Sequence, residues 1–272
     1  MTLLREWVWS DLSGVTLSIV NTKNQSYPKK YLLNYNFGVR LVGQRTNFYR
    51  GEYLVTGPST SVYQPGEVLE AHPISLGRLS YISLCFEPEA FSHYVRTVLE
   101  QDRVSVFPQM VPADHANWRL SRLLLDSLKT LQGATLERDE SLLKLVSAYI
   151  FYCAEKPLHV PKLGQEHRIV SSVKDYLHSH VSQNISLKLI AQHCQLSPWY
   201  VQRVFKAELG VSPHEYLTAL RLHKAKFLLR QGKSTRQVAS QLGFHDRSHL
   251  TQVFKRFEYL SPAAYRAVVR QR

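Results

Sequence analysis

The sequence predicts an α+β chain, in which an antiparallel β-sandwich or barrel is followed by helices and then by an all-helical domain. Three observations support this prediction. Short runs rich in β-branched and aromatic residues fill residues 12–87, separated by Gly, Pro and Asn at hairpin spacing. Helical periodicity begins near residue 89 and resumes, after a proline-containing break, at residue 168. The phrase V-F-K followed by Ser-Pro-x-x-Tyr occurs twice in the last third, 49 residues apart.

The first part of the chain has five segments with the strand pattern. They cover residues 12–20, 38–43, 49–57, 60–72 and 79–86. Turn residues separate them at short intervals, which is typical of antiparallel hairpins in a sandwich or barrel.

Three candidate helices follow, at residues 90–101, 114–131 and 137–154. The loop between the second and third is short, so these two should pack as an antiparallel pair. Their leucine-rich stripes could form a homodimer contact through residues 114–154, or they could close the core of their own domain. The sequence leaves both alternatives open.

Residues 156–167 contain two prolines and a glycine and show no helical or strand periodicity. This pattern indicates an extended connector between two domains. We therefore divide the chain into a first domain at residues 1–156, a linker at 157–166 and a helical domain at 167–272. The two parts of the chain also differ in net charge. Residues 167–272 contain 17 Lys and Arg but 5 Asp and Glu, whereas residues 1–166 contain 17 Lys and Arg and 16 Asp and Glu. This asymmetry indicates a polyanion partner for the helical domain.

Cysteine usage and hydropathy exclude several classes of protein. Cys85, Cys153 and Cys194 are scattered, so they form neither a disulfide framework nor a metal-ligand spacing. The first residues have an early Arg and Glu and no long apolar core, unlike a signal peptide. No apolar run reaches 18 residues. We expect a cytoplasmic protein with no membrane contact.

The first copy of the repeat predicts a helix-turn-helix at about residues 186–209. Ser186 is a suitable N-cap for one helix, and Ser197 with Pro198 begins the next after a tight turn. Val201, Val204, Phe205 and Leu209 fall on the inner face of that second helix. The opposite face carries Trp199, Gln202, Arg203 and Lys206.

The second copy predicts the same unit at about residues 234–257. Ser234 and Gln237 form a capping box, Gly243 supplies the turn and Asp246 caps the following helix. Its inner face carries Leu250, Val253, Phe254 and Phe257. Its outer face carries Ser248, Thr251, Gln252 and Lys255.

A connector helix joins the two units, beginning at Ser212 and Pro213 and ending near Gln231, with Gly232 beyond it. Its length is about 28 Å, against about 34 Å for one turn of B-DNA. Two recognition helices held at this spacing could enter successive major grooves on one side of a duplex. The partner we expect is therefore double-stranded DNA.

The outer faces suit base and phosphate contacts. Arg203 can fork onto guanine, Gln202 and Gln252 can bridge adenine, and Trp199 can touch thymine methyl groups. Arg247, Ser248 and His249 are further candidate base readers at the second unit. The candidate phosphate contacts are Lys206, Thr251, Lys255 and Arg256. The alternative is that both faces are solvated surfaces of a protein-interaction bundle.

These motifs resemble the DNA-binding domain of the AraC/XylS family of bacterial transcription regulators. The resemblance spans residues 185–266 and includes SPWYVQRVFK, GVSPHEY, RLHKAKFLL, VASQLGF, SHLTQVFK and SPAAYR. It implies binding to about two successive major grooves, with base contacts from the seven residues named above as base readers. It also implies contact with RNA polymerase.

The N-terminal domain is similar to the cupin-like effector and dimerisation domain of that family, through residues 51–73. A metal-binding cupin gathers two His and a Glu, but here His72 stands alone and Leu69 follows the Gly-Glu-Val motif. We therefore expect no metal, no cofactor and no enzyme activity, while a small organic effector remains open. We assign no ligand residues, and a solvated or core role is favoured for the Tyr and Arg of this half: Arg40, Arg45, Tyr49, Arg50, Tyr53 and Tyr81.

The sequence as a whole predicts a two-domain transcription regulator, an activator located in the bacterial cytoplasm and associated with the nucleoid. The N-terminal domain would sense an effector or dimerise, and the C-terminal domain would read DNA. Two alternatives remain: a cupin enzyme with an attached DNA module, and a structural nucleoid protein without sequence preference.

Overall fold

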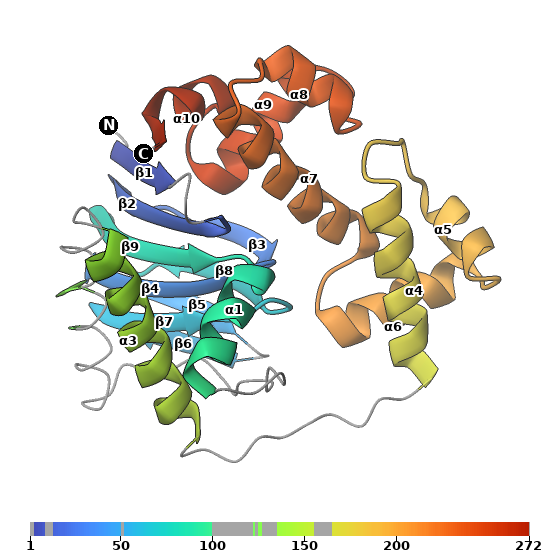
Figure 1. The fold of residues 1–272 in the computed structure, drawn as a ribbon. Coiled ribbons are helices and arrows are strands. Elements are labelled where there is room, and N and C mark those ends of the chain that lie inside the picture. Colours follow the sequence, from blue (N-terminus) through green and yellow to red (C-terminus); the bar gives the residue numbers. More distant parts are fainter. Residues whose placement is uncertain are drawn as a thin grey trace.

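The computed structural model describes residues 3–8, 13–49, 52–99, 122, 125–126, 135–154 and 165–271. A β-rich domain with two helices on one side is followed by an all-helical domain, as the sequence predicts (Figure 1). Within the described ranges, no helix has both the length and the apolar character needed to cross a membrane.

The β-rich domain is built from two sheets. One contains six strands in the order β10-β1-β2-β9-β4-β7, and the other contains four in the order β3-β8-β5-β6. All pairings are antiparallel except β1 with β10. The strands are β1 (Leu3–Val8), β2 (Val15–Lys23), β3 (Tyr27–Tyr31), β4 (Tyr35–Val42), β5 (Arg45–Tyr49), β6 (Glu52–Thr56), β7 (Ser59–Tyr63), β8 (Val68–Pro73), β9 (Arg78–Phe86) and β10 (Val269–Gln271).

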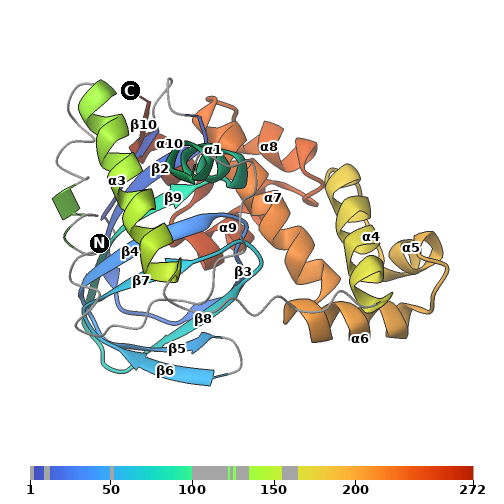
Figure 2. The same cartoon turned by 60° about the horizontal axis from the view of Figure 1, so that its bottom comes forward.

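The two faces of the six-stranded sheet differ in character because side chains alternate along each strand. Leu17, Leu84 and Phe86 lie on the apolar face, which is covered by α1 (Pro88–Leu99) and α3 (Thr135–Ala154). Their neighbours Ser18 and Ser83 face the other way, into a cavity between this sheet and the rest of the molecule. Figure 2 shows α3 lying across the strands.

The sequence left open whether the leucine stripe of α3 forms a dimer contact or closes the core of its own domain. Leu142, Leu145 and Val146 are almost completely buried in the core formed with the six-stranded sheet. The apolar face of α3 therefore closes the core of its own domain. The candidate helix at residues 114–131 lies largely outside the described residues.

Four of the described strands lie outside the five predicted segments: β1, β3, β10 and all of β5 except its last residue. β1 pairs with β2 on one side and with β10, from the other end of the chain, on the other side. Such a pairing depends on residues far apart in sequence, so local periodicity does not reveal it. The linker expected at residues 157–166 lies mostly outside the described residues, which resume at residue 165 with the first turn of α4.

The first helix of the helical domain begins at residue 165, three residues before the periodicity that starts at residue 168. Its helices are α4 (Gln165–Ser179), α5 (Leu187–His193), α6 (Pro198–Leu209), α7 (Pro213–Arg230), α8 (Thr235–Gln241), α9 (Arg247–Glu258) and α10 (Pro262–Val268). All the expected caps form: each N-cap side chain accepts a hydrogen bond from a backbone N–H three residues later. The capping residues are Ser186, Ser197, Ser212, Ser234, Asp246 and Ser261.

The repeated phrase encodes a repeated aromatic contact. Phe205 packs edge-to-face on Tyr216, with ring centroids 5.6 Å apart, and Phe254 packs on Tyr265 in the same way at 5.4 Å. The first half of α7 shares its core with α4, α5 and α6, and the second half shares another core with α8, α9 and α10. The connector helix therefore completes both units and fixes their separation.

The helical domain also packs against the β-rich domain. α7 and α9 lie against β3, and α10 lies against β1 beside β10 (Figure 1). Tyr31 of β3 is buried against Tyr216 of α7, with ring centroids 4.8 Å apart. The interface between the domains consequently includes both halves of the connector.

Candidate nucleic-acid interface and interdomain cavity

The outer face of α6 is exposed, and side chains on this helix contact one another. Trp199 is 70% exposed, and Gln202, Arg203 and Lys206 are exposed on the same face. The Arg203 guanidinium lies 5.2 Å from the Trp199 ring centre and 5.1 Å from that of Tyr200. These cation–π contacts hold Arg203 on the outer surface before any partner binds. Tyr200 was not singled out from the sequence, although its place next to Trp199 was visible.

The outer face of α9 carries the second set of predicted residues. Six of them are exposed: Arg247, Ser248, His249, Gln252, Lys255 and Arg256. Two residues on this helix already have partners within the protein. Thr251 is half-buried and its hydroxyl donates to the carbonyl of Arg247 at 2.8 Å, while His249 Nδ1 accepts from the backbone N–H of His245 at 3.4 Å. The assignments to bases and phosphates remain predictions for both helices.

The capping carboxylate of Asp246 lies at the start of α9. It accepts a hydrogen bond from the backbone N–H of His249 at 2.7 Å. That bond, followed by one from the side chain of His245, lowers the pKa of Asp246. The cap therefore stays ionised at neutral pH and satisfies the first turn of the second recognition helix.

Arg221 in the middle of α7 ties the two helix-turn-helix units together. Its Nε donates to the carbonyl of Val181 at 3.0 Å and its Nη2 to that of Gln183 at 2.6 Å, both in the loop after α4. The guanidinium also lies 5.8 Å from the Phe244 ring centre in the turn of the second unit. Gly243 lies so close to this loop that a Cβ would come 2.6 Å from the carbonyl oxygen of Ser182. The relative position of the recognition helices is thus held at a second point besides α7.

A cavity of about 270 Å³ lies between the two domains. Both sheets contribute to its lining, and the helical domain closes it with residues from α7 and the end of α9. Its apolar wall includes Val20, Leu32, Leu69, Leu79, Leu222 and Phe257. Charged and polar side chains share the lining with this wall. A chamber that combines apolar surface with polar groups can hold a small organic ligand.

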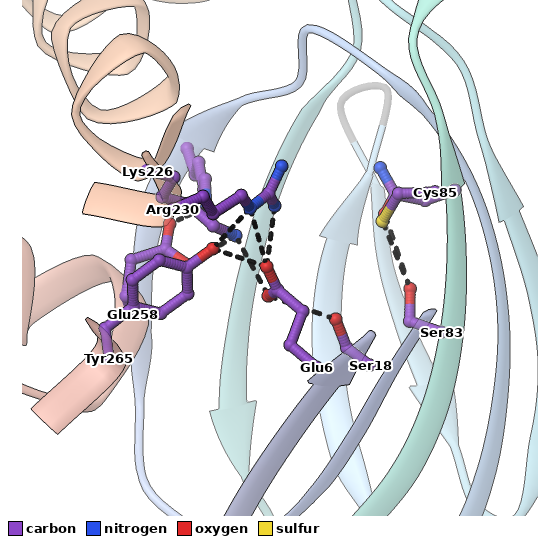
Figure 3. Close-up of polar contacts among 10 residues, drawn as sticks. Glu6, Ser18, Ser83, Cys85, Lys226, Arg230, Glu258 and Tyr265 are labelled. Atoms are coloured by element: carbon purple, nitrogen blue, oxygen red, sulfur yellow. Dashed lines mark hydrogen bonds and ion pairs between the residues drawn. The ribbon is translucent and has the colours of Figure 1, made fainter. Parts of the chain in front are cut away.

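One edge of the cavity is a network of buried charges that joins the domains (Figure 3). Glu6 of β1 accepts hydrogen bonds from the Tyr265 hydroxyl and from Arg230, whose Nη2 lies 2.6 Å away. Burial alone would raise the pKa of Glu6, but the charges of Lys226 and Arg230 and these hydrogen bonds lower it below its usual value. Glu6 is therefore ionised in the folded protein.

Glu258 at the end of α9 makes a similar connection. Its carboxylate lies 2.7 Å from Lys30 Nζ of β3 and 3.2 Å from Lys226 Nζ of α7. Burial opposes ionisation, but the two lysines lower the pKa of Glu258 to about 2. This carboxylate thus holds α9 against both the β-rich domain and the connector helix.

Three of the Tyr and Arg side chains left unassigned from the sequence line this cavity: Arg40, Arg45 and Tyr81. Tyr53 is 65% exposed instead, and residue 50 lies outside the described ranges. The sequence signal was the alternation along β4, where Phe37 enters the apolar core and Arg40 lies on the opposite face. Alternation alone could not reveal that this opposite face is enclosed, because the second sheet and the helical domain enclose it.

His72 lies on β8, in the segment where a metal-binding cupin would place metal ligands. Its Nε2 lies 3.2 Å from Glu70 Oε1 and its Nδ1 lies 3.2 Å from Ser26 Oγ. Among the residues that the structure describes, no group of three or more His, Cys, Asp or Glu could hold a metal ion.

Comparison with known proteins gives two family matches, one for each domain. Residues 13–146 match the AraC-like ligand binding domain, and residues 190–267 match a helix-turn-helix domain. The HTH-type transcriptional regulator YbfI of Bacillus subtilis is 26% identical over 83% of this chain and 82% of that protein. The arabinose operon regulatory protein of Escherichia coli is 27% identical over 60% of this chain and 50% of that protein. The chain thus spans about half of that second relative.

A solved structure matches the whole architecture. ToxT from Vibrio cholerae, in its form with bound unsaturated fatty acid, aligns with 94% of this chain and 96% of that chain at a TM-score of 0.62. The two sequences are 13% identical, so this likeness concerns the fold. The two-domain arrangement is therefore shared with a protein known from experiment.

Proposed function

The chain belongs to the AraC/XylS family of bacterial transcription regulators, and on this premise we propose that it activates transcription by binding a specific DNA sequence through α6 and α9. The observation that carries the proposal is the pair of capped helix-turn-helix units that share α7. Its 18 residues make α7 about 27 Å long, compatible with two successive major grooves about 34 Å apart.

We propose that α6 and α9 contact different bases of the DNA site. Arg203 with Gln202 and Trp199 on α6 offers guanine, adenine and thymine-methyl contacts. On α9, Gln252 is an exposed adenine reader, with Arg247, Ser248 and His249 at the start of that helix. Lys206, Lys255 and Arg256 would supply salt-dependent affinity for phosphates. Thr251 is a weaker phosphate donor, because its hydroxyl already donates within α9.

We further propose that a small molecule in the interdomain cavity modulates DNA binding. Support comes from the position of the cavity, whose lining includes α7 and the end of α9. A ligand that prefers one arrangement of the domains would shift the population of chains able to bind DNA or RNA polymerase. The related fold of ToxT holds an unsaturated fatty acid, and by analogy an organic ligand is the effector class we favour.

Genome-wide mapping of bound DNA in the bacterium tests the proposal, since it gives both the cognate sequence and the neighbouring genes. The cognate duplex should then compete about 10³-fold better than a random duplex of equal length. Equal competition would instead favour a structural nucleoid protein. Expression of the mapped genes in a deletion strain separates activation from repression.

The homodimer through residues 114–154 stays a prediction that light scattering on the full chain can test. The buried stripe of α3 weakens it, because Leu142, Leu145 and Val146 are occupied within the same chain. A dimer would have to use other faces of this segment.

A further inference from the structure

The C-terminal ends of both recognition helices lie against one pair of strands, the β3–β8 ribbon (Tyr27–Tyr31 and Val68–Pro73). Each helix ends with a residue in the left-handed region, Gly210 after α6 and Tyr259 after α9, with φ of 71° and 62°. A Cβ on Gly210 would come 3.5 Å from Val68 Cγ2 on β8. The ring of Tyr259 packs on that of Tyr27 on β3, with centroids 5.4 Å apart. The repeat therefore presents two equivalent helix ends to the same ribbon.

A β-bulge allows β3 to contact both helix-turn-helix units. Tyr27 pairs with Ala71 of β8 and Lys30 pairs with Leu69, so the register shifts by one residue between them. Side chains three residues apart lie on opposite faces of a regular strand, but this shift brings Tyr27 and Lys30 to the same face, which lines the cavity. Tyr31 is the next residue, and its ring enters the core of the first unit.

Tyr31 is linked to the first recognition helix through a chain of aromatic rings. Its ring packs edge-to-face on Tyr216 of α7 with centroids 4.8 Å apart, and Tyr216 packs in the same way on Phe205 of α6 at 5.6 Å. All three rings are buried, and Val68 packs against the same core. A change at Tyr31 therefore reaches Phe205, the residue that anchors α6.

The other face of β3 holds the end of the second recognition helix. Lys30 Nζ lies 2.7 Å from the carboxylate of Glu258, the last residue of α9, and the two side chains are 20% and 13% exposed. Water and salt screen such a pair less than one at the surface. The ring contact between Tyr27 and Tyr259 lies beside it. The second unit is thus attached to the ribbon by a half-buried ion pair and an aromatic contact.

These attachments restrict how the two units move relative to one another. Tyr27 and Tyr31 are four residues apart, which corresponds to about 13 Å along a strand. The ribbon belongs to a hydrogen-bonded sheet, so the distance between its two points of contact is fixed. Any bending of α7 that reorients one unit has to break the contact at Tyr31 or the contact at Lys30. The ribbon consequently adds to the restraint that Arg221 places on the units.

We propose that the β3–β8 ribbon determines which spacing of DNA half-sites the recognition helices accept, with Tyr31 as the positioning residue for α6 and Lys30 for α9. One base pair inserted between half-sites moves one of them by about 3.4 Å and turns it by about 35° around the duplex. Units attached to the ribbon cannot follow this movement, whereas units released from it have more freedom. This inference rests on the proposed function for its meaning in DNA recognition. The restraint itself can be measured without DNA.

Electron–electron distance measurement on the full chain tests the restraint. Spin labels are attached to cysteines introduced by Ala207→Cys on α6 and Ser240→Cys on α8, both exposed, after the chain's own three cysteines are replaced by alanine. The parent should give one narrow distance distribution, and Tyr31→Leu and Lys30→Gln should each broaden or shift it. Tyr53→Leu is the matched control, since this tyrosine of the same sheet is 65% exposed. An unchanged distribution in both ribbon variants would overturn the inference.

Fluorescence anisotropy tests the consequence for DNA. The probes are the cognate duplex found by genome-wide mapping and duplexes whose spacer is one or two base pairs longer or shorter. The parent should lose about tenfold or more in affinity for each such change, and Tyr31→Leu and Lys30→Gln about threefold or less. Circular dichroism checks that both variants are folded.

A duplex with a single half-site separates positioning from general stability. Parent and variants should bind it within about twofold of one another, because the outer faces of α6 and α9 are unchanged. A purely structural role for Tyr31 and Lys30 would lower affinity for all duplexes by the same factor. That result, or a parent that accepts every spacing equally, would overturn the inference.

The two proposals fail in different ways. Altered label distances in the ribbon variants of a chain that never distinguishes cognate from random DNA would support the restraint and reject the proposed function. Specific DNA binding with the same spacing preference in the parent, Tyr31→Leu and Lys30→Gln would reject the role of the ribbon and leave the proposed function standing.

Discussion

Glu6 in β1 and Arg230 in α7 form a buried ion pair across the domain interface, with 2.6 Å between Oε1 and Nη2. They are 224 residues apart in the chain. Glu6 is 1% exposed in its side chain and Arg230 14%, so water screens the pair little. The docking of the second helix-turn-helix on the β-rich domain therefore depends on a charge at the start of the sequence.

Glu6→Gln should cost about 3–5 kcal/mol of unfolding free energy, because it leaves the Arg230 guanidinium buried without its counter-charge. Urea unfolding followed by circular dichroism measures this loss. Glu140→Gln is the matched control: Glu140 lies at the same 2.6 Å from Lys144, but both side chains are more than half exposed. That variant should change stability by about 0.5 kcal/mol or less, and equal losses in the two variants would show that burial does not matter here.

Acidification should weaken the folded chain first through His223 on α7. Burial, together with the nearby cations Lys226, Arg230 and Lys30, lowers its pKa from the usual 6.5 to about 4. A lowered folded pKa means that the unfolded chain binds the proton first. Stability is therefore complete above pH 6.5 and falls as the pH drops towards 4. We expect a loss of about 1–2 kcal/mol, reduced from the full shift because the ring is 37% exposed.

The pH dependence of stability should be compared with that of the His223→Gln variant. In this variant the loss of stability between pH 6.5 and 4 should be smaller. Glu258 acts at lower pH, since its folded pKa of about 2 lies below the usual 4.5. Its contribution is present above pH 4.5 and is lost as the pH falls towards 2. Thermal unfolding between pH 8 and 4 measures the His223 step, and an unchanged step in His223→Gln would assign it to another group.

The helix-turn-helix units could be predicted because their signals are local. A Ser or Asp cap, a Pro at the first helical position and a stripe of apolar residues each act within one or two turns of helix. Phe205 and Phe254 were placed correctly inside by this reasoning. The domain docking could not be predicted, because the partners of Glu6 lie at the other end of the chain. Likewise, the pattern of β4 places Arg40 opposite the apolar face, but it cannot show that the second sheet and the helical domain enclose that opposite face.

The repeated aromatic pairs should be essential to their units. Phe205→Ala or Phe254→Ala should cost about 3–5 kcal/mol, because each ring is fully buried against a tyrosine of the following helix. Phe227→Ala on α7 is the control, since that ring is 52% exposed. Urea unfolding compares the three variants, and a stable, fully active Phe205→Ala would contradict the burial of the repeated face.

Arg203→Ala should weaken cognate DNA binding by about 1–3 kcal/mol while affecting random DNA less. The reason is that its guanidinium lies against Trp199 and Tyr200 on the exposed face of α6, where we propose that it contacts a base edge. Lys206→Ala is the comparison: a phosphate contact should lose affinity on every sequence and reduce the salt slope by about one. Fluorescence anisotropy over a range of salt concentrations measures both, and an equal loss on all sequences for Arg203→Ala would assign Arg203 to phosphate.

The spacing of the recognition helices should depend on Gly243. Both Gly243 and Gly232 have positive φ, 65° and 81°. Alanine at either position should therefore cost about 1–2 kcal/mol for the left-handed backbone. A Cβ at Gly232 meets nothing within 4 Å, whereas one at Gly243 would come 2.6 Å from the Ser182 carbonyl and 2.8 Å from Arg221 Nη2.

Gly243→Ala must consequently displace either the turn before α9 or the loop that Arg221 holds, and either displacement moves one recognition helix relative to the other. We expect it to lower stability more than Gly232→Ala, and to weaken binding to a duplex that contains both half-sites. Binding to each half-site alone should fall less, because each unit keeps its own core. If the two alanine variants lost the same stability and bound the full site equally well, α7 alone would set the spacing and the contact at Gly243 would be incidental.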